Sequence, residues 1–277
     1  MLDAIWNTRS YLFWLMAASL FCLLLERVFP WRKEQRLLRP QWSQDLFFLF
    51  FNGQFFGLLL ARVVAALFGW VPDDPGPHLL GAAPLWVQFG VFFLVKDFLE
   101  WCVHYCLHRV RWLWQFHKLH HSIVELDWIG NFRFHWMEIV LYRALTYLPL
   151  MALGVSDAVL LPIAVLSTLI GHLNHANVKI SWGPLRYLLN SSRMHVWHHD
   201  MVKHHRYGQN YGIVFSLWDW LFGTAYWPAD RLQPDQLGFG RMASFPRRLL
   251  PRLIYPFWRG RGTSIALEKG EKTSRER

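Results

Sequence analysis

The sequence predicts an all-α, polytopic membrane protein with about five transmembrane helices and a cytoplasmic helical cap that carries a histidine-rich dimetal site. Three observations lead to this prediction. Hydrophobic residues make up 53% of the 277 residues and charged residues only 17%, whereas ordinary soluble domains average about 45–50% and about 25%. Apolar runs near the length of a membrane-spanning helix recur along the chain. Histidine occurs 14 times, and most copies are clustered.

Five apolar runs are expected to form the transmembrane helices. The first, residues 11–29, is interpreted as an uncleaved helix, because its apolar stretch exceeds the ~7–15 residues of a signal-peptide core. The other runs lie at 46–70, 85–107, 136–153 and 159–170. We expect each to cross the membrane, for which ~20 residues are needed. The segment 109–133 between the third and fourth runs is too polar to span.

The distribution of Lys and Arg predicts the orientation, because short loops rich in these residues stay in the cytoplasm. The loop 31–39 is basic, whereas the loops 71–84 and 154–157 contain neither Lys nor Arg. The segments 108–135 and 171–277 are again basic. These assignments agree with one another if the chain spans five times with its N-terminus outside. Arg143, inside the fourth run, is the one residue that fits poorly.

Ten histidines form four clusters, and all four fall at the predicted cytoplasmic face. Two clusters have the spacing i, i+3, i+4 and one has the spacing i, i+4, so each cluster can present its rings from one face of a helix. The predicted metal ligands are His104, His108, His117, His120, His121, His172, His175, His195, His198 and His199.

Ten imidazoles exceed the three or four protein ligands that one zinc ion takes. Two metals with open coordination positions fit better. Imidazole binds Zn, Cu, Fe and Ni, so the residues alone do not name the metal. Four further residues are candidates to orient the ligands and act in catalysis, namely Asp97, Glu100, Asn174 and Asp200. For the first two, the alternative is an ion pair with Lys96 or Arg109.

The remaining histidines are expected to be structural or are left open. His78 lies in an outside loop, and we expect an ordinary hydrogen-bonded role for it. His204 and His205 fit no helical triplet and are expected at the surface or beside the ligands. The role of His135 is undecided at this level.

The histidine motifs resemble the fatty acid hydroxylase / sterol desaturase superfamily of integral membrane oxygenases. That family carries HxxxH, HxxHH and a later HxxHH in this order. Here the pattern is completed by a Gly-His-Leu-Asn-His segment at 171–175, by Asn-Tyr-Gly at 210–212 and by Trp-Asp-Trp-Leu-Phe-Gly-Thr at 218–224. The three motifs are His104-x-x-x-His108, His117-x-x-His120-His121 and His195-x-x-His198-His199.

The resemblance covers roughly residues 85–227 and implies a non-haem di-iron centre, with zinc as a possible substitute metal, that uses O2 to hydroxylate or desaturate a lipid. It also implies an external electron-transfer protein, ferredoxin-like or cytochrome b5-like. The sequence agrees, since it contains no dinucleotide-binding Gly motif after a strand and no cysteine set for an iron–sulfur cluster.

Three segments follow from this interpretation: N-terminal transmembrane helices (1–84), a fatty acid hydroxylase-like catalytic domain (85–227) and a basic cytoplasmic C-terminal tail (228–277). The tail suits the anionic lipids of the cytoplasmic leaflet. Nucleic-acid binding is not expected, because aromatic residues fill the whole chain and do not mark one basic face. The length favours a bacterial inner membrane, with the metal site on the cytoplasmic face.

Two other classes of function stay open at this level. A zinc-dependent membrane hydrolase would need a general base such as the Glu of HExxH, and the sequence contains no such motif. A non-catalytic metal-binding or transport protein would place its ligands along a path near the bilayer midplane. The predicted ligands lie together at one face, which argues against transport.

Overall fold

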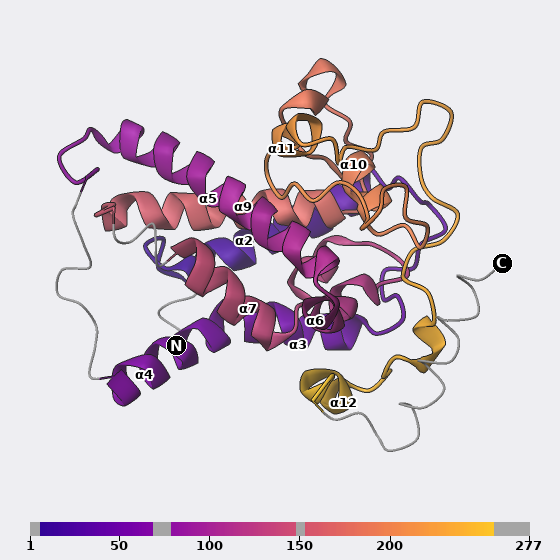
Figure 1. The fold of residues 1–277 in the computed structure, drawn as a ribbon, viewed down its shortest axis with the longest axis horizontal. Coiled ribbons are helices and arrows are strands. Elements are labelled where there is room, and N and C mark those ends of the chain that lie inside the picture. Colours follow the sequence, from indigo (N-terminus) through magenta and orange to yellow (C-terminus); the bar gives the residue numbers. More distant parts are fainter. Residues whose placement is uncertain (1–5, 69–78, 148–152, 258–277) are drawn as a thin grey trace.

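The computed structural model describes residues 6–68, 79–147 and 153–257, and in these ranges it is helical, with no β-strand (Figure 1). The all-α prediction is confirmed for these ranges. His78, most of the loop 71–84 and the tail 258–277 lie outside the described residues. Of the described helices, Tyr11–Val28 and Ala158–His175 have the length and apolar composition of a membrane span. The number of spans and the cytoplasmic cap stay predictions.

Two long apolar helices begin at serine caps. Helix α2 (Tyr11–Val28) starts at Ser10, whose side chain accepts a hydrogen bond from the Leu12 amide, and α9 (Asp157–His175) starts in the same way at Ser156. Each cap satisfies an amide that the first helical turn leaves without a partner. The apolar run predicted at 159–170 thus belongs to a longer helix, because the polar residues that follow continue its last turn.

Helices α2 and α9 run side by side in the same direction. The Tyr11 hydroxyl lies 2.6 Å from the Thr168 hydroxyl near the start of α2, and Ser19 Oγ lies 3.3 Å from His172 Nε2 further along. Helix α5 (Leu85–Arg109) packs parallel to α9, with Phe92, Phe93, Val159 and Ile163 in one buried cluster. The carboxyl ends of these helices therefore meet at the same end of the molecule (Figure 1).

The other two apolar runs form broken helices. Helix α3 (Trp42–Phe50) continues through the π-helix η1 (Phe51–Phe55) into α4 (Phe56–Phe68). Helix α7 (Trp136–Tyr142) continues into the π-helix η3 (Arg143–Tyr147), which begins at the poorly fitting arginine of the fourth run. Each of the five predicted runs coincides with helix over its described residues, except at the last residue of the first run and of the fourth run.

Short elements surround the ends of α5 and α9. Helix α6 (Arg111–His121) follows α5 after one residue, and α10 (Ser192–His198) is capped by the Ser191 side chain. The rest of this end is built from brief helices, namely η2 (Trp128–Phe132), η4 (Gly183–Tyr187), α11 (Leu217–Leu221), η5 (Met242–Ser244) and α12 (Leu249–Ile254).

A buried ionic cluster links the segment before α3 to the loop after α6. Arg39 Nη2 lies 2.5 Å from Asp127 Oδ1 and 2.8 Å from Asp45 Oδ2, and Asp45 also pairs with Arg133. The cluster contains two cations and two carboxylates, so their charges balance. Balance matters here, because an unpaired charge buried in a protein is strongly destabilising.

Candidate metal centre

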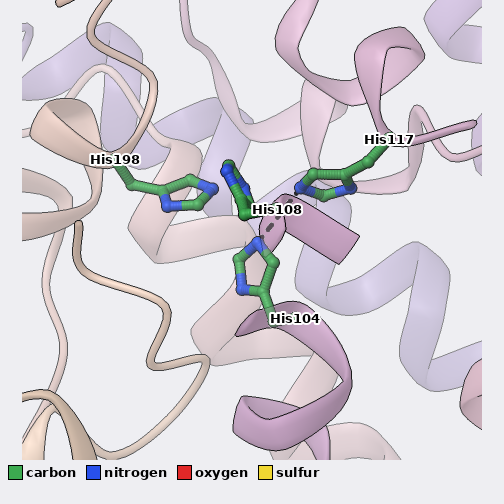
Figure 2. Close-up of side chains that lie close together, drawn as sticks. All are labelled: His104, His108, His117 and His198. Atoms are coloured by element: carbon green, nitrogen blue, oxygen red, sulfur yellow. Dashed lines mark hydrogen bonds between the residues drawn. The ribbon is translucent and has the colours of Figure 1, made fainter. Parts of the chain in front are cut away.

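Eight of the ten predicted ligands converge in two groups. In each group, one ring nitrogen from every histidine lies within 4.8 Å of the corresponding nitrogens of the others, and every member is buried. The first group, drawn in Figure 2, is His104, His108, His117 and His198. The second group is His120, His175, His195 and His199.

Each histidine group is built from residues of more than one helix. Helix α5 and helix α6 give three histidines to the first group, and α10 gives the fourth. Figure 2 shows their rings turned toward a common centre. The groups are adjacent, since the ring centroids of His198 and His199 are 5.2 Å apart and those of His117 and His120 are 5.3 Å apart.

Backbone and carboxylate acceptors fix which ring nitrogen carries the proton. His104 Nδ1 donates to the Tyr211 carbonyl at 2.7 Å, and His198 Nδ1 donates to the Gln209 carbonyl at 2.9 Å. A carbonyl oxygen can only accept, so Nδ1 holds the hydrogen and Nε2 keeps a bare lone pair. His175 is held in the same way by the Gly171 carbonyl at 2.9 Å.

His117 is oriented by a carboxylate. Its Nδ1 lies 2.7 Å from Glu138 Oε2, and neither side chain is exposed. A carboxylate on the outer nitrogen is the arrangement that orients many metal-ligating histidines and raises their basicity. Glu138 comes from α7, so this helix supports the site although it contributes no ligand.

The resulting lone pairs face each other, which tests whether a metal fits. The Nε2 atoms of His104 and His117 are 3.1 Å apart, yet both rings already donate through Nδ1. Two neutral acceptors at this distance repel, and a cation between them removes the repulsion. The spacing is close to the separation of about 3.3 Å between nitrogens in a tetrahedral zinc site.

The second group has the same character. His175 Nε2 lies 3.3 Å from His120 Nε2 and 3.2 Å from His195 Nε2, and His195 Nε2 lies 3.2 Å from His199 Nε2. Several buried nitrogens across the two groups have no hydrogen-bond partner, namely Nδ1 of His120, His195 and His199 and Nε2 of His198. His198 Nε2 lies opposite the Nδ1 that donates to Gln209, so its lone pair faces the first group, where a cation would satisfy it. The three unpartnered Nδ1 atoms lie on the outer side of rings whose Nε2 atoms face the second group.

Burial keeps these rings neutral. The pKa values of His117, His120 and His199 lie well below the usual range, first because burial disfavours the charged ring and second because neighbouring imidazoles would repel it. Neutral imidazole is the form that binds a metal. The electrostatics of the site therefore agree with its geometry.

The other two predicted ligands lie differently. His121 Nε2 is 3.1 Å from His108 Nε2, and its ring centroid is 4.7 Å from that of His199, so it sits between the groups. His172 lies outside both groups, where its Nδ1 donates to the Trp128 carbonyl at 2.9 Å and its Nε2 faces Ser19. Both of its nitrogens are thus engaged by protein.

The four predicted supporting residues are buried, but they contact groups other than the ligand histidines. Asp97 accepts hydrogen bonds from the amides of Val214 and Phe215. Glu100 pairs with Lys96 at 2.6 Å, which is the alternative considered above.

The amide of Asn174 donates to the Ile213 carbonyl at 2.6 Å, and Asp200 contacts His204 at 2.7 Å. Three of the four predicted supporting residues thus hold the loops around the site, while Glu100 engages the Lys96 side chain. Their predicted part in catalysis stays a prediction.

Sequence reasoning missed Glu138 and Tyr211. Glu138 could have been found, because it is a carboxylate inside a predicted apolar run. Tyr211 is fully buried, its hydroxyl has no hydrogen-bond partner among the described residues, and its ring centroid is 5.1 Å from that of His108. No spacing in the sequence pointed to it, although it lies in the Asn-Tyr-Gly segment.

Three histidines outside the clusters have structural contacts in the part of the chain that the structure describes. His135 caps α7, where its Nδ1 accepts from the Met137 amide, and its Nε2 donates to the Leu253 carbonyl at 2.9 Å. His204 stacks on Tyr226 with ring centroids 3.7 Å apart. His205 lies 3.2 Å from the Ala225 carbonyl. These contacts give His135 a capping role.

Comparison with known proteins identifies the class. Residues 89–224 match the family model described as fatty acid hydroxylase. This segment therefore matches a fatty acid hydroxylase domain, and the relatives below are consistent with the fatty acid hydroxylase / sterol desaturase superfamily that the histidine motifs predicted. No solved structure matches the chain.

Several characterised relatives belong to the same class. The chain is 33% identical to an ornithine lipid hydroxylase of Rhizobium tropici over 64% of its own length and 52% of the relative. It is 26% identical to a fatty acid hydroxylase of a Lecanicillium species, covering 62% and 51% of the two chains. A methylsterol monooxygenase of Arabidopsis thaliana is 26% identical over 50% and 46%. The chain thus spans about half the length of these relatives.

Proposed function

We propose that this protein is a membrane-bound, O2-dependent oxidoreductase that hydroxylates or desaturates a C–H position of a lipid, with two non-haem irons held by its histidines. The observation that carries the proposal is the pair of four-histidine groups, which lie next to each other and turn Nε2 atoms toward one another. The named relatives act on ornithine lipid, fatty acid and methylsterol substrates, so a lipid is the expected substrate class.

We assign the two groups as the ligands of the two irons. His121 is close enough to His108 to add a ninth nitrogen. When bound, the irons supply the one-electron chemistry that lets O2 react with an unactivated C–H bond. The protein orients each ring through its Nδ1 contacts and keeps bulk water away through burial. Zinc can occupy the same nitrogens, because imidazole does not select iron.

The overall reaction requires two electrons from outside the protein in each turnover. Hydroxylation converts RH, O2, two electrons and two protons into ROH and water, so one C–H bond and the O–O bond break and one C–O bond and three O–H bonds form. Desaturation consumes the same two electrons and two protons and yields a C=C bond and two waters. The relatives named hydroxylase and monooxygenase support hydroxylation as the main outcome.

The location and domain division are part of the proposal. We infer a multi-pass protein of a bacterial inner membrane whose metal site faces the cytoplasm, with O2, a membrane lipid and an external electron-transfer protein as its partners. The matched segment 89–224 falls inside the proposed catalytic domain 85–227. The apolar α2 and α9 support a membrane location.

Lipid mass spectrometry tests the proposal directly. Extracts of cells that express the protein are compared with extracts of cells that express His120→Ala. We expect one lipid class to gain an oxygen atom, or to lose two hydrogen atoms, only with the unchanged protein. Purified protein should contain iron, and turnover should consume O2. Unchanged lipids together with hydrolytic activity dependent on zinc would overturn the proposal.

A further inference from the structure

Four exposed cations form a basic rim beside the first histidine group. Arg109 and Arg111 lie at the junction of α5 and α6, and Lys203 and Arg206 lie in the loop after α10. The two segments meet through Tyr207, since the guanidinium groups of Arg109 and Arg206 lie 5.6 Å and 5.2 Å from its ring centroid. Tyr207 thus joins the two segments of the basic rim.

No acidic side chain offsets this charge from within the two segments. Residues 101–124 contain three Lys or Arg and residues 201–218 contain two, and neither stretch contains Asp or Glu. The carboxylates that flank residues 201–218 are buried and occupied, Asp200 by His204 and Asp219 by the amides of Tyr211 and Gly212. Of those that flank residues 101–124, Glu100 pairs with Lys96 and Glu125 is partly exposed. The rim therefore presents a local positive field.

Trp114 connects the rim to the histidines. Lys203 Nζ lies 5.6 Å from the centroid of the Trp114 ring, on the rim side. The same ring lies 5.0 Å from His108, 5.2 Å from His121 and 6.0 Å from His117, measured between centroids. Trp114 is only partly buried, so one aromatic ring links the surface to the proposed metal ligands.

We propose that an acidic one-electron carrier protein docks on the basic rim and that its electrons reach the site through Trp114. The inference rests on the proposed function, which consumes two electrons per turnover and therefore two molecules of such a carrier. Each carrier is oxidised by one electron, and O2 is reduced by these two electrons together with two electrons taken from the substrate, whose C–H bond is oxidised. Opposite charges steer such encounters and raise their rate, and the interfaces of redox pairs are small.

Anionic lipid is the competing occupant of a basic surface near a membrane. The position of Trp114 favours the carrier. An electron carrier needs a path to the metal ligands, and the Trp114 ring lies beside three of them, whereas binding of a lipid headgroup needs no such path. Measurements in neutral nanodiscs distinguish the carrier from anionic lipid as the occupant, since these nanodiscs contain no anionic headgroup. If the cations only hold lipid, reversing their charge will not change electron transfer in neutral nanodiscs, and the inference is overturned.

The first experiment measures electron transfer by stopped flow. Iron-loaded protein in phosphatidylcholine nanodiscs is mixed with reduced plant-type [2Fe–2S] ferredoxin, an acidic carrier, and its oxidation is followed at several salt concentrations. We expect Lys203→Glu/Arg206→Glu to lower the second-order rate constant at least about tenfold at low salt, because the electrostatic contribution to encounter is lost. The difference should shrink as salt rises, because ions screen the field.

A single charge reversal outside the rim controls for net charge, and its counterpart within the rim is Lys203→Glu alone. Lys179→Glu reverses an exposed lysine in the loop between α9 and η4, outside both segments of the rim. We expect its rate constant to stay within about twofold of the unchanged protein, since encounter responds to local charge. Equal effects of Lys179→Glu and Lys203→Glu would contradict a defined docking surface.

A second pair of variants tests the path through the ring. Trp114→Leu should slow the first-order transfer step at saturating ferredoxin and leave the concentration for half-saturation unchanged, whereas Trp114→Phe should recover part of the rate. Iron content is measured in each variant. Equal first-order rates in all three proteins would exclude Trp114 as the path.

Reduction by dithionite separates this inference from the proposed function. A small reductant does not need the basic rim, so every variant that holds iron should be reduced by it at the same rate. Failure of the unchanged protein to bind iron, or to be reduced by dithionite, would count against the di-iron function itself. Reduction by dithionite with no effect of the rim variants on ferredoxin would overturn only the docking site.

Discussion

His117 Nδ1 and Glu138 Oε2 lie 2.7 Å apart in a fully buried contact between α6 and α7. The carboxylate accepts the Nδ1 hydrogen, so the Nε2 lone pair is left facing His104 at 3.1 Å. Glu138 also accepts from the backbone amide of His135, which closes a capping box at the start of α7. One carboxylate thus fixes the helix start and the ligand orientation together.

Replacing this carboxylate should weaken metal binding. We expect Glu138→Ala to lower the affinity of the first histidine group by about 10–100-fold, because the outer hydrogen bond to His117 is lost. Glu138→Gln should lower the metal affinity less, since its side-chain amide oxygen can still accept the hydrogen bond from His117 Nδ1. Competition with a chromophoric chelator measures the affinity. Glu125→Gln, at a partly exposed position on the loop after α6, is the control and should behave like the unchanged protein.

Single ligand substitutions should abolish activity and spare membrane insertion. His198→Ala and His120→Ala each remove one nitrogen from a different group, so both should reduce lipid oxidation below detection and lower iron content. Membrane fractionation should show unchanged insertion, because the apolar helices are intact. His205→Ala, which lies in neither group, should keep its activity. Full activity in His198→Ala would rule out the assigned first group.

Gly208 should not accept a side chain. Its φ is +126°, and a Cβ there would lie 3.1 Å from the Tyr211 hydroxyl and 3.3 Å from His108 Nδ1. Gly208→Ala should therefore cost about 1 kcal/mol or more in strain and shift the His108 ring. Thermal unfolding and iron content measure the two effects. Gly240→Ala meets no atom within 4 Å and should leave both unchanged.

The metal-free protein should lose stability in mild acid. In the folded chain, the pKa values of His117, His120 and His121 lie well below the usual range, because burial and neighbouring rings disfavour the charged form. In the unfolded chain they return to about 6.5. Below this pH the unfolded state binds more protons, so the free energy of unfolding decreases as pH falls.

Thermal unfolding of the metal-free protein between pH 7.5 and 5.5 checks this sign. The midpoint should fall over that interval, most steeply below about pH 6.5. A His120→Phe/His121→Leu variant removes two of these groups and should show a shallower decline. A midpoint that rises toward pH 5.5 would mean that these rings are charged in the folded protein.

Breaking the ionic cluster should destabilise the fold. Asp45→Asn leaves Arg133 and Arg39 with one carboxylate, that of Asp127, to share. We expect a loss of about 3–5 kcal/mol, the usual result of removing one partner of a buried pair. Denaturation in detergent measures it. Asp235→Asn breaks an exposed pair with Arg231 and should change stability little.

Much of the architecture follows from apolar runs and histidine spacing. The runs predicted helices because 20 or so apolar residues between polar loops have no other stable arrangement in a membrane. The spacing predicted convergence of the histidines, and eight of them do converge. The division into groups did not follow from spacing. His117 and His120 belong to one motif, yet they serve different groups.

The reason is geometric. Residues three apart on a helix differ by about 60° in direction and about 4.5 Å in height, which is enough to reach adjacent sites. The Glu100–Lys96 pair was among the alternatives, but the partners of Asp97 were beyond prediction. Asp97 was recognised as unusual in an apolar helix, but its acceptor role toward the amides of Val214 and Phe215 depends on a loop more than 100 residues away. Only tertiary packing determines such contacts.

The ionic cluster around Asp45 also determines which truncations and chimaeras of this protein can fold. The matched segment starts at residue 89, which suggests that everything before it is a detachable anchor. Yet Arg39 and Asp45 neutralise Asp127 and Arg133 within that segment. A fragment trimmed to 89–224 would bury Asp127 and Arg133 without these partners. A chimaera with N-terminal helices from another protein would need residues equivalent to Arg39 and Asp45 to stay folded.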